Sequence, residues 1–286
     1  MAVVRRNGTF VRIPIPADAR DGVDLFVQAP PEPRGVVLYV HGKSSAFYRG
    51  MSWWLPMLLE RMPVVHASIN MRSHSLGYSV RPEPGDPLRG LRGGMWEDVD
   101  AGAVDIATAI DYLAAEYRLP IWVVGHSAGG FYAVTGAAAT SHQLAGRILL
   151  SPLVTHRRNF AEWFGDTART EQAITRAREM VAGGRGHLLI PLPTRQWAIS
   201  AWSLVQRAEQ DPDVWPRALA ARQSPVLMGW GTAEELRPHS EFQTIFDRID
   251  LPDKSNFVLT DSGHNYEGYE NEVASQLEKF IAGGTR

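Results

Sequence analysis

Five residues, Gly125 to Gly129, constrain the fold of this chain more than any other stretch, because they directly follow the apolar run Ile121–Val124. Their sequence is Gly-His-Ser-Ala-Gly. A buried strand that turns sharply into a helix holds its middle residue in a strained conformation, and only small flanking residues allow so tight a turn. The pattern therefore predicts that Ser127 stands exposed at the end of a strand. A free serine hydroxyl is a weak nucleophile, so a chemical role requires a base, an acid and oxyanion donors elsewhere.

Composition and length exclude several other classes of protein. With 286 residues and 44% hydrophobic content, the chain can bury a large core, and α/β folds of this length commonly form one domain with an insertion. The net charge of -2 provides no overall field for nucleic acid or membranes, so we expect neither as a partner. The absence of cysteine rules out disulfides, thiolate metal sites and a cysteine nucleophile. Because no apolar stretch is long enough for a signal peptide or a membrane span, we expect a soluble, cytoplasmic protein.

Strand-like and helix-like runs alternate along the chain, which is typical of a mostly parallel sheet with helices on both faces. Eight runs are predicted to be strands: Phe10–Ile15, Val23–Gln28, Gly35–Val40, Val64–Ile69, Ile121–Val124, Arg147–Leu150, Val226–Trp230 and Phe257–Thr260. Apolar residues at helical spacing predict helices over Trp96–Tyr117, from Ser127 to Ala138, and from Val273 to the glycines at 283 and 284. We therefore expect an α/β fold built on an eight-stranded sheet.

One long stretch interrupts this alternation. Residues 152–224 contain helix-like patterns and a glycine-rich interruption at 183–186, but no convincing strand. Because so long a segment is unusual as a plain connection, we expect a helical cap at 152–224, inserted between core segments 1–151 and 225–286. Its aromatic side chains either line a pocket above the exposed serine or form the cap's own small core. The candidates for the pocket are Trp163, Phe164, Trp197 and Trp202, together with Phe160 and Trp215.

The candidate base is His264, in the segment Asp-Ser-Gly-His-Asn that follows the last predicted strand. In a parallel sheet the carboxyl ends of the strands open onto one crevice, so this loop can meet Ser127. An imidazole suits the role because it can take the serine proton and return it to a leaving group near neutral pH. The alternative is an ordinary loop histidine with no catalytic role.

The candidate acid is Glu234, with Glu235 as the alternative. Both lie in the loop after the strand Val226–Trp230 and precede His264 in the chain. A carboxylate in this position would fix the imidazole tautomer and stabilise the imidazolium ion. If both glutamates are solvated loop charges, an acid such as Asp261 has to take this role.

Oxyanion donors are expected from the turn that follows the third predicted strand. This turn, His-Gly-Lys-Ser at 41–44, contains a glycine that permits the backbone to aim its N–H groups into the crevice. We assign the oxyanion hole to the backbone N–H groups of Lys43 and Ala128, with Ser44 as a substitute for Lys43. The histidine at 41 and His126 are expected to brace these loops rather than to take part in the chemistry.

Together these motifs resemble the α/β-hydrolase superfamily, in particular its serine esterases and lipases with a helical cap. The resemblance rests on Gly-His-Ser-Ala-Gly, His-Gly, Gly-x-x-acid and Gly-His, each after a predicted strand, and covers the core from about Gly35 onward, excluding the cap. The order Ser127, Glu234, His264 matches the family order of nucleophile, acid and histidine. The glutamate departs from the family's usual aspartate. The segment 70–75 departs from its Asp-x-Arg-Gly-x-Gly loop, so no function is transferred to it.

The resemblance implies acyl transfer through a serine ester, with no metal or organic cofactor. Ser127, deprotonated by His264, would attack an ester, thioester or related carbonyl, and water would then hydrolyse the acyl-enzyme. A serine at this position, where the family's epoxide hydrolases and dehalogenases have an aspartate, argues against both of those activities.

The substrate class follows from the predicted cap. Its aromatic residues favour an apolar acyl group or ring, so we expect first a carboxylesterase for small or medium, largely apolar substrates. A thioesterase or acyltransferase is the second reading, because ten arginines against seven acidic residues in 151–224 would attract an anionic substrate or the phosphopantetheine of an acyl carrier. Proteins of one fold can also lose catalysis and serve as ligand receptors. The sequence indicates no oligomeric state.

Overall fold

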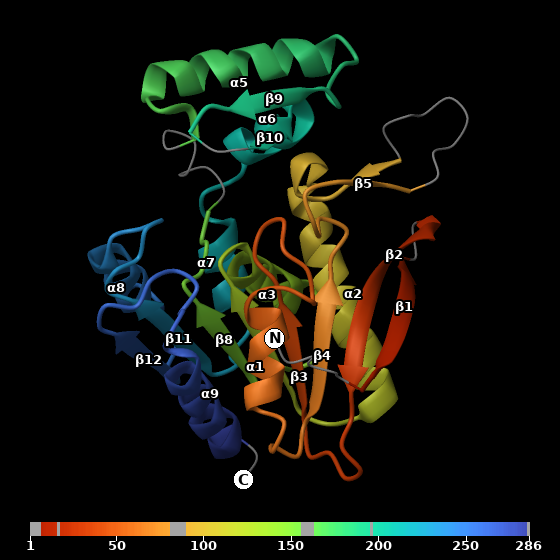
Figure 1. The fold of residues 1–286 in the computed structure, drawn as a ribbon, viewed down its shortest axis with the longest axis vertical. Coiled ribbons are helices and arrows are strands. Elements are labelled where there is room, and N and C mark those ends of the chain that lie inside the picture. The colour runs from red at the N-terminus through yellow and green to blue at the C-terminus, as the bar shows by residue number, and fades with distance from the viewer. Residues whose placement is uncertain (1–6, 16–17, 81–89, 156–162, 195–196, 285–286) are drawn as a thin grey trace, which may run out of the picture.

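A computed structural model describes residues 7–15, 18–80, 90–155, 163–194 and 197–284. Its centre is a sheet with the strand order β1-β2-β4-β3-β7-β8-β11-β12 (Figure 1). These strands are β1 (Thr9–Ile15), β2 (Asp18–Gln28), β3 (Val36–Val40), β4 (Val65–Asn70), β7 (Ile121–His126), β8 (Gly146–Leu150), β11 (Val226–Gly231) and β12 (Lys254–Leu259). Pairing is parallel from β4 through β12, whereas β1 and β2 add an antiparallel edge. The predicted mostly parallel, eight-stranded α/β fold is confirmed.

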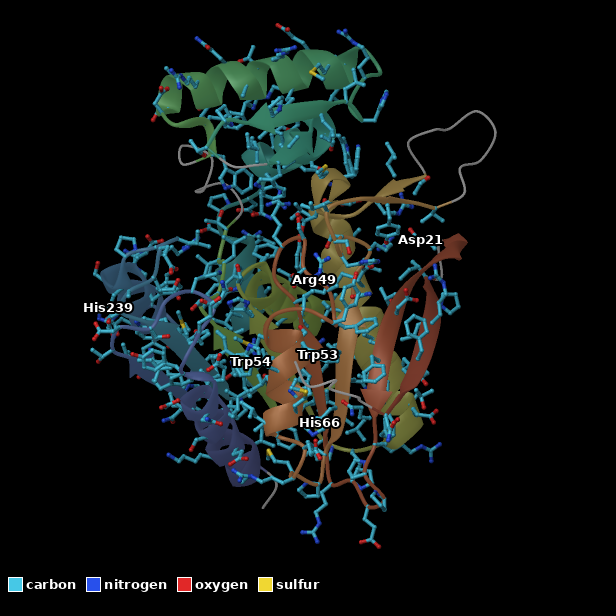
Figure 2. The ribbon with its side chains drawn as sticks, in the orientation of Figure 1. Asp21, Arg49, Trp53, Trp54, His66 and His239 are labelled. Carbon is cyan, nitrogen blue, oxygen red and sulfur yellow. The ribbon has the colours of Figure 1, made fainter. Side chains whose placement is uncertain are left out.

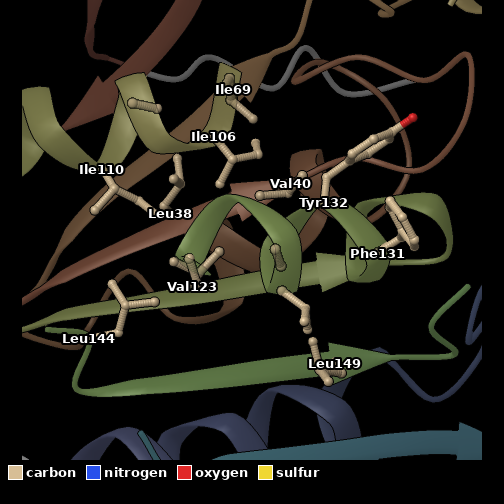
Figure 3. Packing of buried hydrophobic residues seen from close by; sticks show 14 of the residues in the cluster. Leu38, Val40, Ile69, Ile106, Ile110, Val123, Phe131, Tyr132, Leu144 and Leu149 are labelled. Carbon is tan, nitrogen blue, oxygen red and sulfur yellow. The ribbon is translucent and has the colours of Figure 1, made fainter. Parts of the chain in front are cut away.

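Helices cover both faces of this sheet (Figure 1). They are α1 (Met51–Leu58), α2 (Val99–Tyr117), α3 (Ala128–Ala139), α7 (Val214–Ala220), α8 (His239–Asp247) and α9 (Glu270–Gly284). Successive strand residues point to opposite faces. In β3, Leu38 packs with α2, α3, α7 and α8, whereas Tyr39 packs with α1 and α9. Figure 3 shows the first of these layers, where Ile106 of α2 and Phe131 of α3 lie over the strands. The sheet is therefore buried on both sides, which explains why the central strands β3 and β7 contain continuous apolar runs.

Helix α2 begins three residues later than the predicted start at Trp96. Residues Gly94–Trp96 form a short 3₁₀ turn, η1, and Asp98 caps the helix by accepting hydrogen bonds from the N–H groups of Asp100 and Ala101. A capping carboxylate satisfies N–H groups that have no acceptor inside the helix. The helix ends where Arg118 adopts a left-handed conformation, with φ 54°.

Two strands begin three or more residues earlier than predicted, and both lie at or next to an edge of the sheet. β12 begins at Lys254 rather than Phe257. Its first half contains the exposed polar residues Ser255 and Asn256, so it does not form an apolar run in the sequence. β2 begins at Asp18 rather than Val23, on the antiparallel edge that it forms with β1. β12 is an edge strand, so its exposed residues need not be apolar. β2 is paired on both sides, and its polar residue Asp21 is buried because it pairs with Arg92.

The prediction that residues 152–224 contain no strand is wrong. β9 (Leu189–Leu192) and β10 (Trp197–Ser200) pair as an antiparallel hairpin. β9 alternates exposed and buried residues over only four positions, and Pro191 at one exposed position weakened the strand signal. The hairpin packs with α5 (Thr167–Ala182) and α6 (Ala201–Glu209) around its own apolar cluster, at the top of Figure 1. We call α5, β9, β10 and α6 the α5–α6 unit.

Helix α7, which follows the α5–α6 unit, packs on the sheet layer instead. Trp215 and Leu219 are buried in the main core cluster, and α7 contacts α3. Trp215, a predicted pocket residue, is therefore a core residue, since it is only 4% exposed and lies in that cluster. A further short pair of strands, β5 (Tyr78–Ser79) and β6 (Leu91–Arg92), lies beside η1. None of the helices within the described ranges has the length and apolar character needed to cross a membrane.

Candidate active site

Ser127 occupies the turn between β7 and α3, with φ 55° and ψ -122°. Positive φ values are uncommon for residues other than glycine, so this is a strained position. A Cβ atom at Gly125 would lie 2.3 Å from Gly129 O, and one at Gly129 would lie 2.2 Å from Val40 O. No side chain fits at either glycine. The turn is held from the neighbouring strand, because the Ser127 N–H donates to Leu150 O at 3.0 Å.

The serine opens onto a cavity of about 530 Å³. Its wall includes Lys43 from the turn after β3, Ala128 from the start of α3, and His264 from the loop after β12. Arg49 and Trp54, from α1 and the turn before it, also line this cavity and are labelled in Figure 2. Residues that are far apart in the sequence thus meet at one end of the parallel sheet.

The imidazole of His264 is held by Glu234. Its Nδ1–H donates to Glu234 Oε2 at 2.8 Å, and the glutamate side chain is completely buried. This hydrogen bond selects the tautomer that leaves Nε2 as a proton acceptor. In the part of the chain that the structure describes, the Ser127 hydroxyl makes no hydrogen bond to the ring, and such catalytic bonds commonly tighten only around a substrate.

The other two candidate acids contact the same loop without reaching the ring. Glu235 Oε2 accepts the backbone N–H of His264 at 3.0 Å, and this hydrogen bond lowers the pKa of Glu235. The backbone N–H of Asp261 donates to Thr232 Oγ1 at 2.8 Å, and Asp261 is exposed. Of the three carboxylates, only Glu234 is therefore placed against the imidazole nitrogen.

The histidine next to the serine also supports this loop. His126 Nε2–H donates to the backbone oxygen of His264 at 2.8 Å, and the two rings lie 4.8 Å apart. Burial, followed by the neighbouring His264, lowers the pKa of His126 to about 3. His41 is similarly enclosed: its Nε2 accepts the Met71 N–H at 3.3 Å, and burial lowers the pKa of His41 to about 4. Both side chains are neutral near pH 7 and hold loops together.

The two candidate oxyanion donors flank Ser127. A Cβ atom at Gly42 would lie 3.2 Å from the Cβ of Ser127, so the turn that carries Lys43 runs directly beside the serine. Ala128 is the first residue of α3, where backbone N–H groups have no acceptor within the helix. Ser44, the alternative donor, has φ 57°, and its hydroxyl is buried.

The side chain of Lys43 enters a buried charged cluster that the sequence did not suggest. Its Nζ donates to Glu97 Oε2 at 2.6 Å and lies 4.8 Å from the centre of the Trp197 ring. Arg207 of α6 donates to the same glutamate oxygen, and Tyr132 of α3 donates to Glu97 Oε1. Burial, followed by the nearby Arg207, lowers the pKa of Lys43 well below its ordinary value. The cluster joins the turn beside Ser127 to α3 and to the α5–α6 unit.

The predicted aromatic pocket is present in part. Trp163 and Trp197 line the Ser127 cavity. Phe164 instead lies within the apolar cluster of the α5–α6 unit, where it is 3% exposed. Trp202 lines a different cavity, of about 400 Å³. Phe160 lies outside the described residues.

Two hydroxyl groups complete the surroundings of the acid, and neither was predicted. The Ser151 hydroxyl donates to Glu234 Oε1, and Tyr266 Oη lies 2.7 Å from Ser151 Oγ. Ser151 directly follows the predicted strand Arg147–Leu150, so the strand-end criterion used for the other site residues would have found it. Neither Glu97 nor Arg207 directly follows a predicted strand, so nothing in the sequence indicated that either lies near the site. Within the described ranges, no group of three His, Asp or Glu side chains is placed to hold a metal ion.

Comparisons with known proteins agree with this architecture. The solved structure of Est1E from Butyrivibrio proteoclasticus with bound ferulic acid has a TM-score of 0.68 and 14% sequence identity, covering 95% of this chain and 98% of its own. A thermostable carboxyl esterase from Bacillus coagulans has a TM-score of 0.69 and 14% identity, with 99% and 100% covered. The esterase Pf2001 from Pyrococcus furiosus has a TM-score of 0.61 and 16% identity, with 96% and 92% covered.

At this level of identity these structures share the fold. No curated protein sequence matches the chain significantly. A family model described as the alpha/beta hydrolase family matches residues 37–275, which is most of the chain. The chain therefore belongs to the alpha/beta hydrolase family.

Proposed function

We propose that this protein is a serine hydrolase that cleaves carboxylic esters through Ser127, His264 and Glu234. One observation carries the proposal. The buried Glu234 accepts the Nδ1–H of His264, and that imidazole and the strained Ser127 line one cavity. A nucleophile on a strained turn, a histidine beside it and a carboxylate behind the histidine are the parts that serine acyl transfer requires.

In this mechanism His264 Nε2 takes the proton of Ser127 as the hydroxyl attacks the ester carbonyl. The negative charge that develops on the carbonyl oxygen is stabilised by the backbone N–H groups of Lys43 and Ala128. The imidazolium then gives its proton to the departing alcohol. Water, activated by the same nitrogen, hydrolyses the acyl-enzyme, and Glu234 stabilises the imidazolium in both steps. Because His126 is neutral, it does not compete as a proton donor.

The cavity supports an apolar acyl group or ring as the preferred substrate part. Trp163, Trp197, Leu153 and Leu236 supply apolar wall around Ser127. Est1E, which shares this fold, was solved with bound ferulic acid, an aromatic molecule. We propose that the α5–α6 unit, within the predicted insertion 152–224, acts as a cap over this pocket, and that small or medium, largely apolar esters are the substrates.

Labelling with a fluorophosphonate probe tests the nucleophile. We expect covalent labelling of the wild-type protein, none of Ser127→Ala, and greatly weakened labelling of His264→Ala. Ser224→Ala is the matched control, since Ser224 is buried and precedes β11, at the opposite end of that strand from the loop that carries Glu234. An unlabelled wild-type protein would contradict the proposal and favour a ligand receptor of the same fold.

A substrate comparison separates the ester hydrolase from the thioesterase and acyltransferase alternatives. The charged side chains of Lys43 and Arg207 in the cavity wall are the feature that favours an anionic acyl carrier. We expect 4-nitrophenyl esters of short and medium acids to be hydrolysed with higher kcat/KM than acyl-thioesters of the same acids. Higher kcat/KM for the thioesters, or transfer to an added alcohol or amine in place of hydrolysis, would assign the site to those activities.

A further inference from the structure

Ser151 stands between the strand that leads to the nucleophile and the strand that leads to the acid. It directly follows β8, the neighbour of both β7 and β11. Its φ is 43°, and its backbone N–H donates to Gly229 O of β11 at 2.8 Å. The residue is 2% exposed. A non-glycine residue held in the left-handed region has a conformational cost, and such residues cluster at functional sites.

The hydroxyl of Ser151 is directed at the candidate acid. It donates to Glu234 Oε1, while Oε2 of the same carboxylate accepts the Nδ1–H of His264. Each oxygen of this completely buried carboxylate therefore has its own donor. A carboxylate away from water remains ionised and fixed in direction only when donors replace its hydration, so the serine hydroxyl performs a task that solvent cannot perform here.

A second hydroxyl stands behind the first. Tyr266 is completely buried, and its Oη lies 2.7 Å from Ser151 Oγ and 2.9 Å from Gly229 O. Burial raises the pKa of Tyr266 above its ordinary range, so the phenol keeps its proton. Since the Ser151 hydrogen points to Glu234, only Tyr266 can donate between the two hydroxyls. Tyr266 Oη also donates to Gly229 O at 2.9 Å, so its one hydrogen is shared between this carbonyl and Ser151 Oγ.

We propose that Ser151 and Tyr266 form a hydroxyl relay, Tyr266 to Ser151 to Glu234, whose two members are positioning residues for the serine hydrolase. The relay acts through the acid and touches neither the substrate nor the nucleophile. It rests on the proposed function, because it supports the acid of that triad. It also allows a glutamate in this fold to present one oxygen to His264 while the other oxygen stays anchored.

A positioning role predicts a change in pH dependence as well as in rate. Ser151 stabilises the ionised state of the Glu234–His264 pair, so removal of its hydroxyl makes the pair take up a proton more readily. The acid limb of the kcat/KM profile then moves to higher pH. The other titratable groups that face the pair, Tyr266, His126 and Glu235, remain in place in this variant.

Two substitutions remove the hydroxyl in different ways. Ser151→Ala keeps the Cβ atom, and Ser151→Gly also relieves the left-handed backbone. For both we expect kcat on a 4-nitrophenyl ester to fall about ten-fold with KM changed less than about two-fold, and the acid limb to rise by roughly one pH unit. Ser262→Ala is the matched control, because Ser262 is equally buried in the His264 loop but donates to Gly263 O. We expect it to keep wild-type values.

Tyr266→Phe tests the hydrogen bond from Tyr266 to Ser151. If the Ser151 variants unfold below the assay temperature, this variant alone tests whether the relay affects the rate and the acid limb. We expect about a three-fold loss of kcat and a smaller shift of the limb in the same direction. Wild-type kcat and an unmoved acid limb in a folded Ser151 variant, or in Tyr266→Phe, would overturn the relay. A uniform loss of rate with no shift of the limb would assign Ser151 a structural role and also overturn it. Fluorophosphonate labelling of the wild type reports separately on the proposed function, so the two failures are distinguishable.

Discussion

At the scale of single residues, the adjacent glutamates after β11 contact His264 in two different ways, so we expect their substitution to change kcat to different extents. Glu234 accepts from the imidazole, whereas Glu235 accepts from the backbone N–H of the same histidine. Replacement of the triad carboxylate by its amide leaves the wrong tautomer at the ring, which costs roughly 10⁴ in kcat in a serine protease. We expect Glu234→Gln to lower kcat by about 10⁴-fold and Glu235→Gln by less than about ten-fold.

Steady-state kinetics on one nitrophenyl ester measures both variants, and thermal unfolding verifies that each is folded. The two substitutions make the same chemical change at neighbouring positions, so each is the control for the other. The opposite order of effects would assign the acid to Glu235. Equal, small effects would remove both carboxylates from the mechanism.

Single residues were predictable where the backbone conformation restricts the residue type. Gly125 and Gly129 are such positions, because the turn leaves no space for a side chain at either. Strand ends were a second source of prediction, and they pointed to Ser127 and His264. Glu97 was not predictable, since its role depends on cations from a distant loop and from α6, which only the folded chain brings together.

At the scale of elements, Arg147 fastens α7 to the sheet. This side chain is completely buried in β8, and its guanidinium donates to the backbone oxygens of Leu219, Arg222 and Ser224 at 2.7 to 3.1 Å. These oxygens lie at and just beyond the end of α7, where the carbonyl groups have no N–H donor inside the helix. Burial, followed by the nearby Arg222, lowers the pKa of Arg147 to about 10, so it remains charged near neutral pH.

We expect Arg147→Met to lower the free energy of unfolding by about 3 kcal/mol or more, because it leaves buried carbonyl groups without their donor. Urea unfolding followed by tryptophan fluorescence measures this change. Arg61→Met is the matched control: Arg61 pairs with Glu278 at 2.7 Å, but its side chain is 78% exposed. Exposed pairs contribute less than about 1 kcal/mol. A similar, small effect in both variants would show that Arg147 does not fasten α7.

Elements buried on both sides were predictable, and elements with an exposed side were less so. β3 and β8 are buried along their whole length and β7 is buried up to its last residue, and the boundaries of these strands in the sequence and the structure differ by two residues at most. β9 exposes alternate residues, and β12 exposes Ser255, Asn256 and Val258; the proline of β9 and the polar residues of β12 interrupt the apolar run. An apolar run in the sequence thus indicates a strand that is buried on both faces, and a strand with one face in solvent is harder to recognise in this way.

At the scale of the whole molecule, Glu97 ties the α5–α6 unit to the core. Its carboxylate binds Lys43 beside the serine, Tyr132 of α3 and Arg207 of α6, and Glu97 is only 2% exposed. Removal of one charge from a buried ionic cluster is strongly destabilising, because it leaves cations in a medium that solvates them poorly. We expect Glu97→Gln to lower the free energy of unfolding by about 3 to 5 kcal/mol.

The same variant should open the α5–α6 unit to protease before the core unfolds, since the anchor of Arg207 is lost. Urea unfolding and limited proteolysis measure the two effects. Glu278→Gln is the control, because it makes the same chemical change in the exposed pair with Arg61. If Glu97→Gln and Glu278→Gln change stability equally, the buried cluster does not hold the molecule together.

The two buried histidines should make the stability of the whole molecule depend on pH. Burial lowers the pKa of His126 to about 3 and the pKa of His41 to about 4, both below the value near 6.5 of an unfolded chain. Between these values the unfolded state binds more protons than the folded state. The contribution of the two histidines to the free energy of unfolding is therefore fully present above about pH 6.5. It falls as the pH decreases through this window, and it does not fall further once the pH is below the pKa values of the folded state.

Each histidine contributes a slope of about 1.4 kcal/mol per pH unit in the middle of its window. Replacement of His126 by glutamine removes one titrating group, and the glutamine amide can still donate to the backbone oxygen of His264. We expect the free energy of unfolding of His126→Gln, measured with urea from pH 7 to pH 4, to fall less steeply than that of the wild type by about this slope. All other titrating groups are common to the two proteins and cancel in the comparison. Parallel curves would mean that His126 accepts its proton in the folded state as readily as in the unfolded state, which its burial behind the loop that carries His264 argues against.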